Sequence, residues 1–357
     1  MNQGTTFIEP PPSMLPKSLP VFIGFILLFI THYIYRNGRS NVNNVWHKME
    51  HIKKLLQDNK KKYTVRLISK LAITHDTFRY RFDLGNKDIR LGLPVGKCLK
   101  VFGTNIAYEQ KSEEWNPRPE MERNGTTMPR DSRPHQTGDM DKDGNWKEII
   151  ERKYTPSTLD SDLGYFEFTI KTYRANDSKI FPNGGKFSQY MESLKVGDDL
   201  IVQGPFGRME YLGRSEWKGK YGTKKHLGLI AGGSGVTPML QLIQAVLSDP
   251  EDKTTLSLLY ANKTVGDIIV KEQLDTWAKD SKGQFTVAYT LDNPPTDGSW
   301  KDQHSGFISA DMINKTLPEP SDETLIVICG PPPMVKFACL PNLEKLKYNM
   351  KNGVGEF

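Results

Sequence analysis

The stretch "HLGLIAGGSGVTPMLQL", residues 226–242, decides the fold of the C-terminal part of this chain. An apolar run typical of a buried strand leads into glycines and then into a periodic apolar segment that indicates a helix. Gly233 and Gly235 let a ligand come close to the backbone, and the helix behind them offers unpaired N–H groups that suit a diphosphate. Pro238 replaces the third glycine usual in such turns, and proline is well tolerated in the first turn of a helix. The stretch therefore predicts a nucleotide-binding turn.

From Lys225 onward, strand-like and helix-like segments alternate. We expect strands over 226–232, 255–262, 284–292 and 324–330, and helices over 238–248, 267–279, 308–315 and 333–346. This alternation is typical of a doubly wound parallel sheet, an α/β fold. Such sheets bind ligands at the carboxyl ends of their strands.

A second strand end carries "VICGPPPMV", residues 327–335, with Cys329 followed by a run of prolines that fixes the backbone. The prolines alone are compatible with nothing more than a stiff loop. A cysteine at the same sheet edge as the glycine turn favours a nucleotide site there.

The part of the chain before Lys225 is rich in β-strand patterns. Residues 63–84 alternate apolar and polar side chains, which predicts antiparallel strands with one buried face. Further strand patterns cover 91–103, 147–158, 164–174 and 196–212, and 180–194 reads as a glycine turn leading into a short helix. Many short strands with one helix predict an antiparallel β-barrel.

Residues 104–145 break this pattern, because they are polar, contain several prolines and show no periodicity. They cannot bury enough apolar area to fold alone, so we expect a long surface insertion. The alternative is a docking element for a partner, for example within a larger membrane complex.

Near the N-terminus, residues 18–35 are almost wholly apolar. About 20 such residues cross a bilayer as a helix, and the basic start and small-residue cleavage site of a signal peptide are missing. We expect a single-pass membrane anchor that contacts lipid. Basic residues after it, including Arg36 and Arg39, favour a cytosolic or matrix location for the rest of the chain.

The composition narrows the class of protein. The chain has 357 residues, 25% of them charged and 37% hydrophobic, which suits about two globular domains. A net charge of +6 is too small to indicate a nucleic-acid partner, and no nucleic-acid-binding motif occurs. Cys98, Cys329 and Cys339 form neither a disulfide framework nor a CxxC metal pair, so we expect a reducing compartment and no metal. Cys98 and Cys339 are interpreted as small buried hydrophobic residues.

A third constellation lies in the β-rich part. Arg152 in "RKYT" offers a permanent two-pronged cation for phosphate, and Tyr154 offers a flat ring to cover a flat ligand. Gly184 and Gly185 precede a helix and predict a second anion site. Each element alone has an ordinary structural explanation, but together with the C-terminal turn they indicate two dinucleotide sites.

On these motifs the chain resembles the ferredoxin–NADP reductase superfamily and, within it, the NADH–cytochrome b5 reductases. The resemblance covers about residues 63–357 apart from the insertion, and it is carried by "RKYTPST" (152–158), "FPNGGKFSQYMESLKVGD" (181–198), "GPFG" (204–207), "LIAGGSGVTPMLQLI" (229–243), "LLYANKTVGDII" (258–269), "YTLDNPP" (289–295) and "CGPPPMVKFACLPNL" (329–343). The chain departs from the family pattern at Lys153, Phe187 and Ser234, where proline, methionine and threonine are common. The insertion before Arg152 is the largest departure.

The resemblance implies five segments: a tail (1–17), a transmembrane anchor (18–36), a linker (37–62), an FAD-binding β-barrel (63–215) and an NADH-binding α/β domain (216–357). It also implies FAD and NADH as cofactors. The expected activity is hydride transfer from NADH to FAD, followed by single-electron transfer to a haem protein, with cytochrome b5 as the first candidate.

The resemblance also implies roles for individual residues. Arg152 would neutralise the FAD diphosphate, Tyr154 would pack against the flavin, and Thr155 would hydrogen-bond near flavin N5. Thr155, Lys171 and Cys329 are the implied catalytic residues, with Cys329 beside the nicotinamide C4. Asp267 matches an acidic position associated with NADH, since a carboxylate there repels a 2′-phosphate. The other implied cofactor contacts are Thr158, Tyr173, Gly184, Gly185, Lys186, Phe187, Ser188, Gly233, Gly235, Thr237, Pro238, Gly330, Pro331, Met334 and Phe357.

Because cytochrome b5 is acidic, Lys186, Lys224 and Lys225 are candidate docking cations. Two alternatives stay open. The acceptor could instead be a quinone or another haem protein, or the chain could be an accessory subunit of a larger membrane redox assembly.

Overall fold

The computed structural model describes residues 51–109, 121–123, 126–128, 139, 141–142, 147–176, 183–301 and 303–357. The chain divides into two units, Met1–Ile52 and Lys53–Phe357, and almost all of the described residues belong to the second. The predicted tail and anchor lie outside the described residues. Within the described part of the chain, no helix combines the length and apolar character that a membrane crossing requires.

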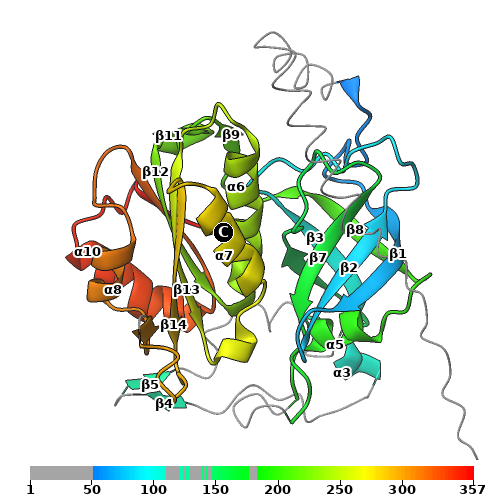
Figure 1. Ribbon diagram of the computed structural model, residues 1–357. Helices are drawn as coiled ribbons and strands as arrows, with labels where there is room; N and C mark the ends of the chain where they lie inside the picture. The colour runs from blue at the N-terminus through cyan, green and yellow to red at the C-terminus, as the bar shows by residue number, and fades with distance from the viewer. Residues whose placement is uncertain are drawn as a thin grey trace, which may run out of the picture. The chain divides into compact units, whose positions relative to one another are not determined.

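The first half of the second unit is an antiparallel sheet, as the sequence predicts. Six strands of the described chain run in the order β6-β3-β8-β1-β2-β7 (Figure 1). They are β1 (Tyr63–Ala72), β2 (Thr77–Asp83), β3 (Cys98–Thr104), β6 (Ile149–Tyr154), β7 (Tyr165–Lys171) and β8 (Asp199–Phe206). Alternate side chains such as Val65 and Leu67 are 2% and 0% exposed, and each buried residue of this size contributes about 2 kcal/mol through the hydrophobic effect.

The two outer strands of this sheet, β6 and β7, are linked through the residues that follow β6. The backbone N–H of Ser157 donates to the Glu167 carbonyl at 2.8 Å, and the N–H of Glu167 donates to Thr158 Oγ1 at 3.1 Å. The closure of the predicted barrel thus takes the form of these few bonds rather than a strand ladder among the described residues.

Two segments interpreted as linker and insertion contribute to this first sheet domain. In the linker, the apolar pair Leu55–Leu56 follows a polar run, and Leu56 is 4% exposed. The Leu56 N–H donates to the Leu91 carbonyl. In the insertion, Asn105 and Ala107 are fully buried at the start of α3 (Ile106–Glu109), and β4 (Met121–Arg123) pairs with β5 (Thr126–Met128). The insertion is therefore anchored where it leaves the sheet.

The second half of the unit is a parallel sheet, again as predicted. Its described strands follow the order β15-β14-β13-β12-β16-β17 and are β12 (His226–Gly232), β13 (Thr255–Asn262), β14 (Phe285–Leu291), β15 (His304–Ser305), β16 (Thr324–Cys329) and β17 (Val354–Glu356). The short strands β15 and β17 were not predicted, because two or three residues carry no readable periodicity.

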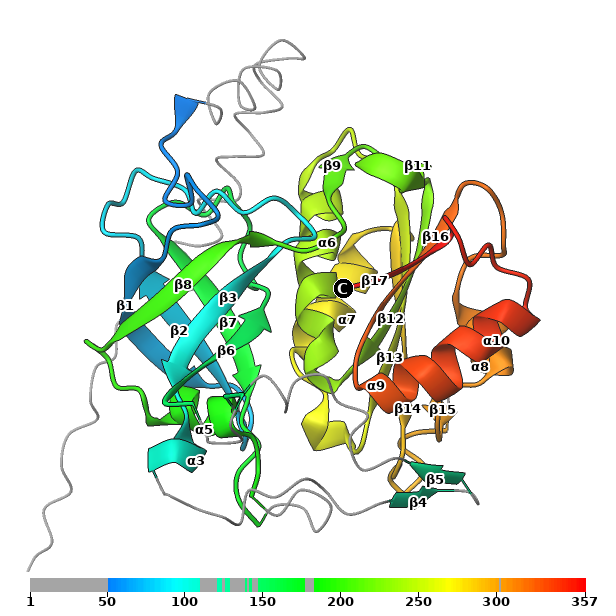
Figure 2. The same cartoon turned by 180° about the vertical axis from the view of Figure 1, so that it is seen from behind.

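Helices cover both faces of the parallel sheet (Figures 1 and 2). One face packs against α6 (Val236–Ser248) and α7 (Lys271–Asp280), and the other against α8 (Ala310–Thr316) and the run α9 (Pro332–Met334), η4 (Val335–Cys339) and α10 (Leu340–Lys345). Along the chain, α5 (Lys186–Ser193) lies between β7 and β8 of the antiparallel sheet. Between the two sheets lie β9 (Tyr211–Gly213), β10 (Glu216–Trp217), η1 (Gly219–Tyr221) and β11 (Gly222–Thr223). Of the two cysteines predicted to be buried, Cys339 is fully buried in the core with α8 and α10, whereas Cys98 is only half-buried.

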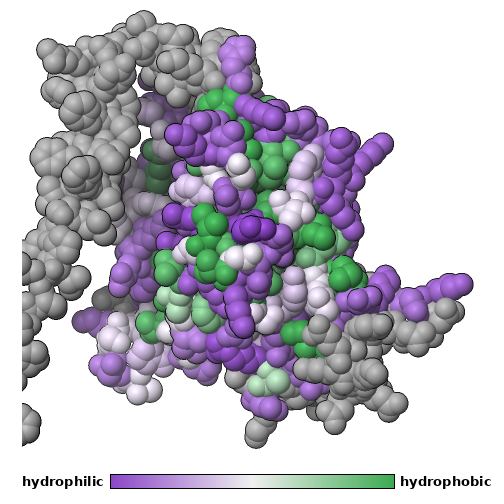
Figure 3. Space-filling view, turned by 90° about the vertical axis from the view of Figure 1, so that its right-hand side faces the viewer, coloured by the Kyte–Doolittle hydropathy of each residue, from purple (hydrophilic) through white to green (hydrophobic). Residues whose placement is uncertain are grey.

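The outer surface of the antiparallel sheet mixes apolar and polar residues. Figure 3 shows green apolar patches separated by purple hydrophilic side chains on this side of the molecule. Ile68, Leu71 and Val196 are 45%, 57% and 62% exposed. Isolated exposed apolar side chains of this kind are normal on a protein surface.

Candidate active site

The glycine turn of the parallel sheet has the predicted strand–turn–helix form. β12 ends at Gly232, η2 covers Gly233–Gly235 and α6 begins at Val236. Gly233 has a φ of 52°, a conformation that favours glycine, and its carbonyl accepts a hydrogen bond from the Tyr260 hydroxyl at 2.9 Å.

The start of α6 shows what the proline changes. The helix begins two residues before Pro238, so the proline lies within the first turn, where its missing N–H leaves no helical bond unmade. Thr237 caps the turn through a hydrogen bond from its hydroxyl to the Ser234 carbonyl at 3.2 Å. The Val236 N–H already donates to the Gly233 and Ser234 carbonyls, so an anion at this turn would have to use the other N–H groups of the turn.

The two loops at this sheet edge pack directly on each other. A Cβ on Gly235 would lie 2.2 Å from the Cys329 carbonyl oxygen, and one on Gly232 would lie 2.7 Å from Met334 Sδ. A Cβ on Gly330 would lie 2.4 Å from Met334 Cε. The sequence suggested that Gly235 makes room for a ligand, whereas the structure shows its α-carbon facing the backbone of the cysteine loop.

Cys329 lies half-buried at the end of β16, followed by Gly330 and the exposed Pro331. Burial raises the pKa of its thiol to about 12, and the nearby Cys98 adds to the shift. Cys329 is therefore a neutral thiol at physiological pH, suited to contact a flat neutral ring rather than to attack it.

This pKa makes Cys329 a slow target for alkylation. At pH 8 we expect iodoacetamide to label it about a thousandfold more slowly than a free cysteine of pKa about 8.5, since only the thiolate reacts. Peptide mass spectrometry of time points measures the rate, with the urea-unfolded chain as the fully reactive control. Labelling of Cys329 at the free-cysteine rate would contradict the buried-thiol description.

Tyr154 ends β6 and packs in an aromatic cluster of the antiparallel sheet. Its ring centroid is 5.8 Å from that of Phe168 and 5.7 Å from that of Phe187. Burial raises the pKa of the Tyr154 phenol, so the ring is neutral. Thr155 follows directly and is half-buried, while Thr158 is 8% exposed and holds β7 through the bond from Glu167 described above.

A second glycine turn lies before α5. Gly184 has a φ of 66°, and a Cβ there would lie 2.2 Å from the Tyr173 carbonyl oxygen, so this position requires glycine. That carbonyl accepts from the Gly185 N–H at 2.8 Å, and Ser188 Oγ accepts from the Tyr173 N–H at 3.1 Å. Backbone atoms of Tyr173 thus shape the turn, while its side chain is 41% exposed.

Beside this turn, Arg152 and Lys186 both contact Asp139, an acidic side chain of the insertion. Arg152 donates to both oxygens of Asp139, with Nη1–Oδ1 at 2.7 Å and Nη2–Oδ2 at 2.5 Å. Lys186, the first residue of α5, has its Nζ 3.4 Å from Asp139 Oδ2. Burial lowers the pKa of Lys186, with Asp139 opposing and Arg152 reinforcing that shift.

Of the three lysines proposed to dock cytochrome b5, only Lys225 is exposed. The prediction is wrong for Lys186 and Lys224, which are 8% and 4% exposed. Lys224 Nζ donates to the Asp322 carbonyl at 2.5 Å. Lys225 is exposed and paired with Glu323. Sequence alone gave their charge but not their burial.

The two sheets are joined by an ion-pair triad centred on Lys171. Its Nζ lies 2.7 Å from Asp267 Oδ1, before α7, and 2.5 Å from Asp76 Oδ2, in the turn between β1 and β2. Burial would lower the pKa of Lys171, but the hydrogen bonds with Asp267 and Asp76 outweigh it and raise that pKa. Burial opposes ionisation of both carboxyls as well, yet the bonds from Lys171 and nearby threonines keep their pKa values below the usual range.

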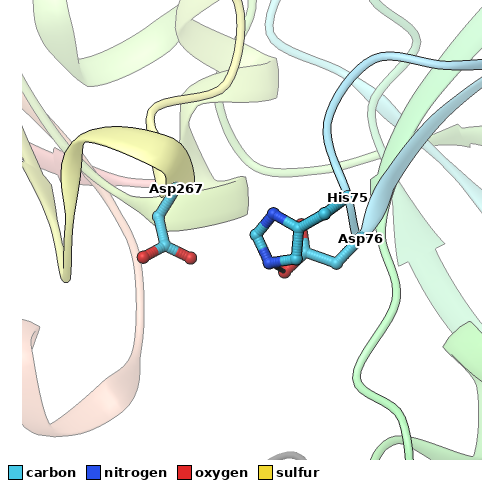
Figure 4. A group of neighbouring side chains, drawn as sticks. All are labelled: His75, Asp76 and Asp267. Atoms are coloured by element: carbon cyan, nitrogen blue, oxygen red, sulfur yellow. Dashed lines mark ion pairs between the residues drawn. The ribbon is translucent and has the colours of Figure 1, made fainter.

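Figure 4 shows His75 and Asp76 facing Asp267 across this junction. Potential ligand atoms of the three residues lie within 4.8 Å of one another, a grouping that could suit a metal ion. Lys171 Nζ contacts both carboxylates, so an ammonium already supplies the positive charge between them. The other oxygen of Asp267 accepts from the Thr264 N–H and hydroxyl, at 3.1 and 2.7 Å.

Further contacts bring the predicted flavin and nicotinamide residues to one region. Leu99 pairs with Tyr154, and its neighbour Cys98 influences the Cys329 thiol of the other sheet. The Gly96 N–H donates to Gln241 Oε1 of α6 at 2.8 Å. The terminal Phe357 packs near Gly96, with its Cε1 3.4 Å from the position of a Cβ there.

Sequence reasoning missed two residues of this region, Asp76 and Asp139. Asp76 stands in an ordinary polar turn, and Asp139 lies in a segment interpreted as surface, although it is 1% exposed. The only available signal was chemical: Lys171 and Arg152 both needed an anion if they were buried.

The residues present fit a flavin nucleotide and a nicotinamide nucleotide. Beside Tyr154 are the half-buried Arg152, the buried Lys186 and a glycine turn that rejects a Cβ, and beside Cys329 is a second such turn. A diphosphate binds to backbone N–H groups and cations. The turn beside Tyr154 has both, and the turn beside Cys329 has the start of a helix.

Comparisons with known proteins agree with this assignment. The family described as "Oxidoreductase FAD-binding domain" matches residues 64–127 and 140–211, and "Oxidoreductase NAD-binding domain" matches residues 229–340. NADH-cytochrome b5 reductase 2 of Gallus gallus is 41% identical over 303 residues, covering 82% of this chain and 85% of the relative. NADH-cytochrome b5 reductase 1 of Homo sapiens is 40% identical over 304 residues, covering 83% and 86%.

A solved structure is similar as well. The cytochrome b5 reductase domain of Ulva prolifera nitrate reductase superposes with a TM-score of 0.70 and 35% identity, covering 85% of this chain and all of that domain. The chain is an oxidoreductase with one FAD-binding and one NAD-binding domain. It belongs to the NADH-cytochrome b5 reductase family and is an FAD- and NADH-dependent reductase.

Proposed function

We propose that this reductase is anchored in a membrane and passes electrons from NADH, through FAD, to cytochrome b5. Bound FAD supplies hydride acceptance and single-electron release, and the chain supplies binding and alignment. The observation that carries the proposal is the contact of the two nucleotide-binding domains through Lys171, which pairs with Asp267 across the junction. The names of the relatives support cytochrome b5 as the acceptor.

Within this proposal the domain of the antiparallel sheet binds FAD and the domain of the parallel sheet binds NADH. Arg152 and Lys186 hold the FAD diphosphate together with the Gly184–Gly185 turn, and Tyr154 covers the flavin. The Gly233–Gly235 turn holds the NADH diphosphate. Cys329, whose pKa of about 12 leaves the thiol uncharged, would present a neutral side chain to the nicotinamide.

Charge supports an acidic partner. The chain carries a net charge of +6, and Lys153, next to Arg152 and Tyr154, is exposed. Opposite charges speed encounter between proteins and make it salt-dependent. The chain is also similar to the cytochrome b5 reductase domain of a nitrate reductase, so another haem protein stays an alternative acceptor.

The full chain, purified in detergent, tests the function directly. We expect a yellow protein whose flavin absorbance bleaches under anaerobic NADH, and whose addition to oxidised cytochrome b5 reduces the haem at a rate that falls as salt rises. Flavin bleaching without haem reduction would identify another acceptor. A colourless protein that FAD cannot reconstitute would favour an accessory subunit.

Membrane anchoring rests on the apolar sequence of residues 18–35. The large domains would lie in a reducing compartment, on the cytosolic face of the endoplasmic reticulum or at a mitochondrial membrane. Alkaline carbonate extraction tests the anchor itself: a membrane-spanning protein stays in the membrane pellet, whereas a peripheral protein is released.

A further inference from the structure

An acidic side chain of the insertion occupies the cation pair assigned to the FAD diphosphate. Asp139 binds Arg152 with both carboxylate oxygens and lies within ion-pair distance of Lys186. Its side chain is 2% exposed, and those of Arg152 and Lys186 are 24% and 8% exposed. This is a built, largely buried anion site rather than a surface ion pair.

The backbone fixes the position of Asp139. Its carbonyl accepts from the Lys147 N–H at 2.9 Å, two residues before β6, the strand that carries Arg152. At the other end of the insertion, Asn105 Nδ2 donates to the Lys147 carbonyl at 2.8 Å, and the Asn105 N–H donates to the Glu148 carbonyl. The described ends of the insertion therefore meet beside the cation pair.

The chemistry of this contact matches that of a phosphate. A carboxylate and a phosphate both take two parallel hydrogen bonds from one guanidinium. Arg152 already gives Nη1 and Nη2 to Asp139. A diphosphate could make the same two bonds only in place of the carboxylate.

The same site needs an anion whenever the diphosphate is away. Arg152 and Lys186 both contact the Asp139 carboxylate, so the two cations lie close together, one half-buried and one buried. Burial and the charge of Arg152 both lower the pKa of Lys186. Removing an anion that compensates two neighbouring, largely buried cations is costly, because the charges that stay behind lose their compensation.

We propose that Asp139 is an internal competitor of the FAD diphosphate. Asp139 weakens and slows FAD binding, and it stabilises the folded protein when FAD is absent. This inference rests on the proposed assignment of Arg152 and Lys186 to the diphosphate. Asp139 lies in the segment that interrupts the match to the FAD-binding domain family, just before that match resumes at residue 140.

The experiment uses the full chain in detergent, stripped of FAD and titrated with FAD while flavin fluorescence is followed. We expect Asp139→Asn to bind FAD about tenfold more tightly and to associate faster, a change worth about 1.4 kcal/mol. We also expect the FAD-free variant to unfold at a lower temperature than the parent, and FAD to raise its melting temperature by more.

Asp199→Asn is the matched control. Asp199 also accepts two bonds from one arginine, Arg66, at 2.9 and 3.3 Å, but on an exposed part of the sheet. We expect no change in FAD affinity for this control. Unchanged or weaker FAD binding by Asp139→Asn would overturn the proposal, since Asp139 would then position Arg152 for the cofactor.

Two additions keep the test decisive. If Asp139→Asn folds poorly, inorganic pyrophosphate is added as the replacement anion, and it should raise the melting temperature of this variant but not of Asp199→Asn. Failure of pyrophosphate to stabilise the variant would also overturn the proposal. Arg152→Ala separates the two levels of inference: unchanged FAD affinity would reject the diphosphate assignment itself, whereas weaker affinity keeps that assignment and leaves the decision to Asp139→Asn.

Discussion

Gly235→Ala is expected to lower the rate of flavin reduction by NADH about a hundredfold while leaving the FAD content unchanged. Gly235 has a φ of −65°, so alanine causes no backbone strain there. Its Cβ, however, would lie 2.2 Å from the Cys329 carbonyl oxygen and 2.6 Å from the Cys329 carbonyl carbon. Either the nucleotide turn or the cysteine loop has to move, and a displacement of about 1 Å between reacting groups costs about a hundredfold in rate.

Stopped-flow absorbance under anaerobic NADH measures this rate, and dithionite reduction shows that the flavin itself is intact. Gly266→Ala is the control, because Gly266 lies one residue before Asp267 and a Cβ there would come no closer than 3.9 Å to Thr264 Oγ1. A Gly235→Ala rate equal to that of the control would mean that the two loops do not set the nicotinamide position.

The nucleotide turn shows which features the sequence could predict and which it could not. The pattern around Gly233 and Gly235 predicted the strand, the turn and the helix, because each depends on neighbours within a few residues. That Gly235 faces Cys329 could not be predicted, since the partner lies 94 residues away and only the pairing of β12 with β16 brings it close.

The charged residues make the same point more sharply. Arg152 was identified as a phosphate cation from a local motif, but its carboxylate partner Asp139 sits in a segment without periodicity, where sequence patterns carry no position. Lys186 and Lys224 were expected at the surface as docking cations and are buried, because charge alone does not report solvent exposure.

Lys171→Met is expected to lower kcat/KM for NADH about a hundredfold and to destabilise the contact between the two domains. The ligand atoms of Asp76 and Asp267 lie within 4.8 Å of each other, and their side chains are 9% and 18% exposed. Without the ammonium, two like charges at this distance repel by about 3 kcal/mol at an effective dielectric constant of about 20. The weaker contact between the two domains would disturb the alignment of a bound nicotinamide with a bound flavin.

A second substitution tests the cause. In the Lys171→Met background, Asp76→Asn removes one of the two facing charges, so we expect it to restore about tenfold of the lost rate, and a double-mutant cycle gives the coupling. Lys225→Met, which breaks the exposed pair with Glu323, should change nothing measurable. Equal losses in the single and double variants would show that Lys171 acts on the substrate directly and not through the two carboxylates.

The pH dependence follows from the direction of the three shifts. The lowered pKa values of Asp76 and Asp267 mean that their stabilisation is present above the unfolded value, about 3.9, and is lost as pH falls through the folded values. The raised pKa of Lys171 means that its stabilisation is present below about 10.4 and is lost as pH rises through the folded value. In the parent the triad keeps its charges between about pH 5 and pH 10. In Lys171→Met the two carboxylates lose the ammonium that lowers their pKa values, and burial together with their mutual repulsion raises the pKa of one of them. The rate ratio of parent to Lys171→Met should therefore be largest where both carboxyls of the variant are ionised, and should shrink as the pH falls and one of them takes up a proton.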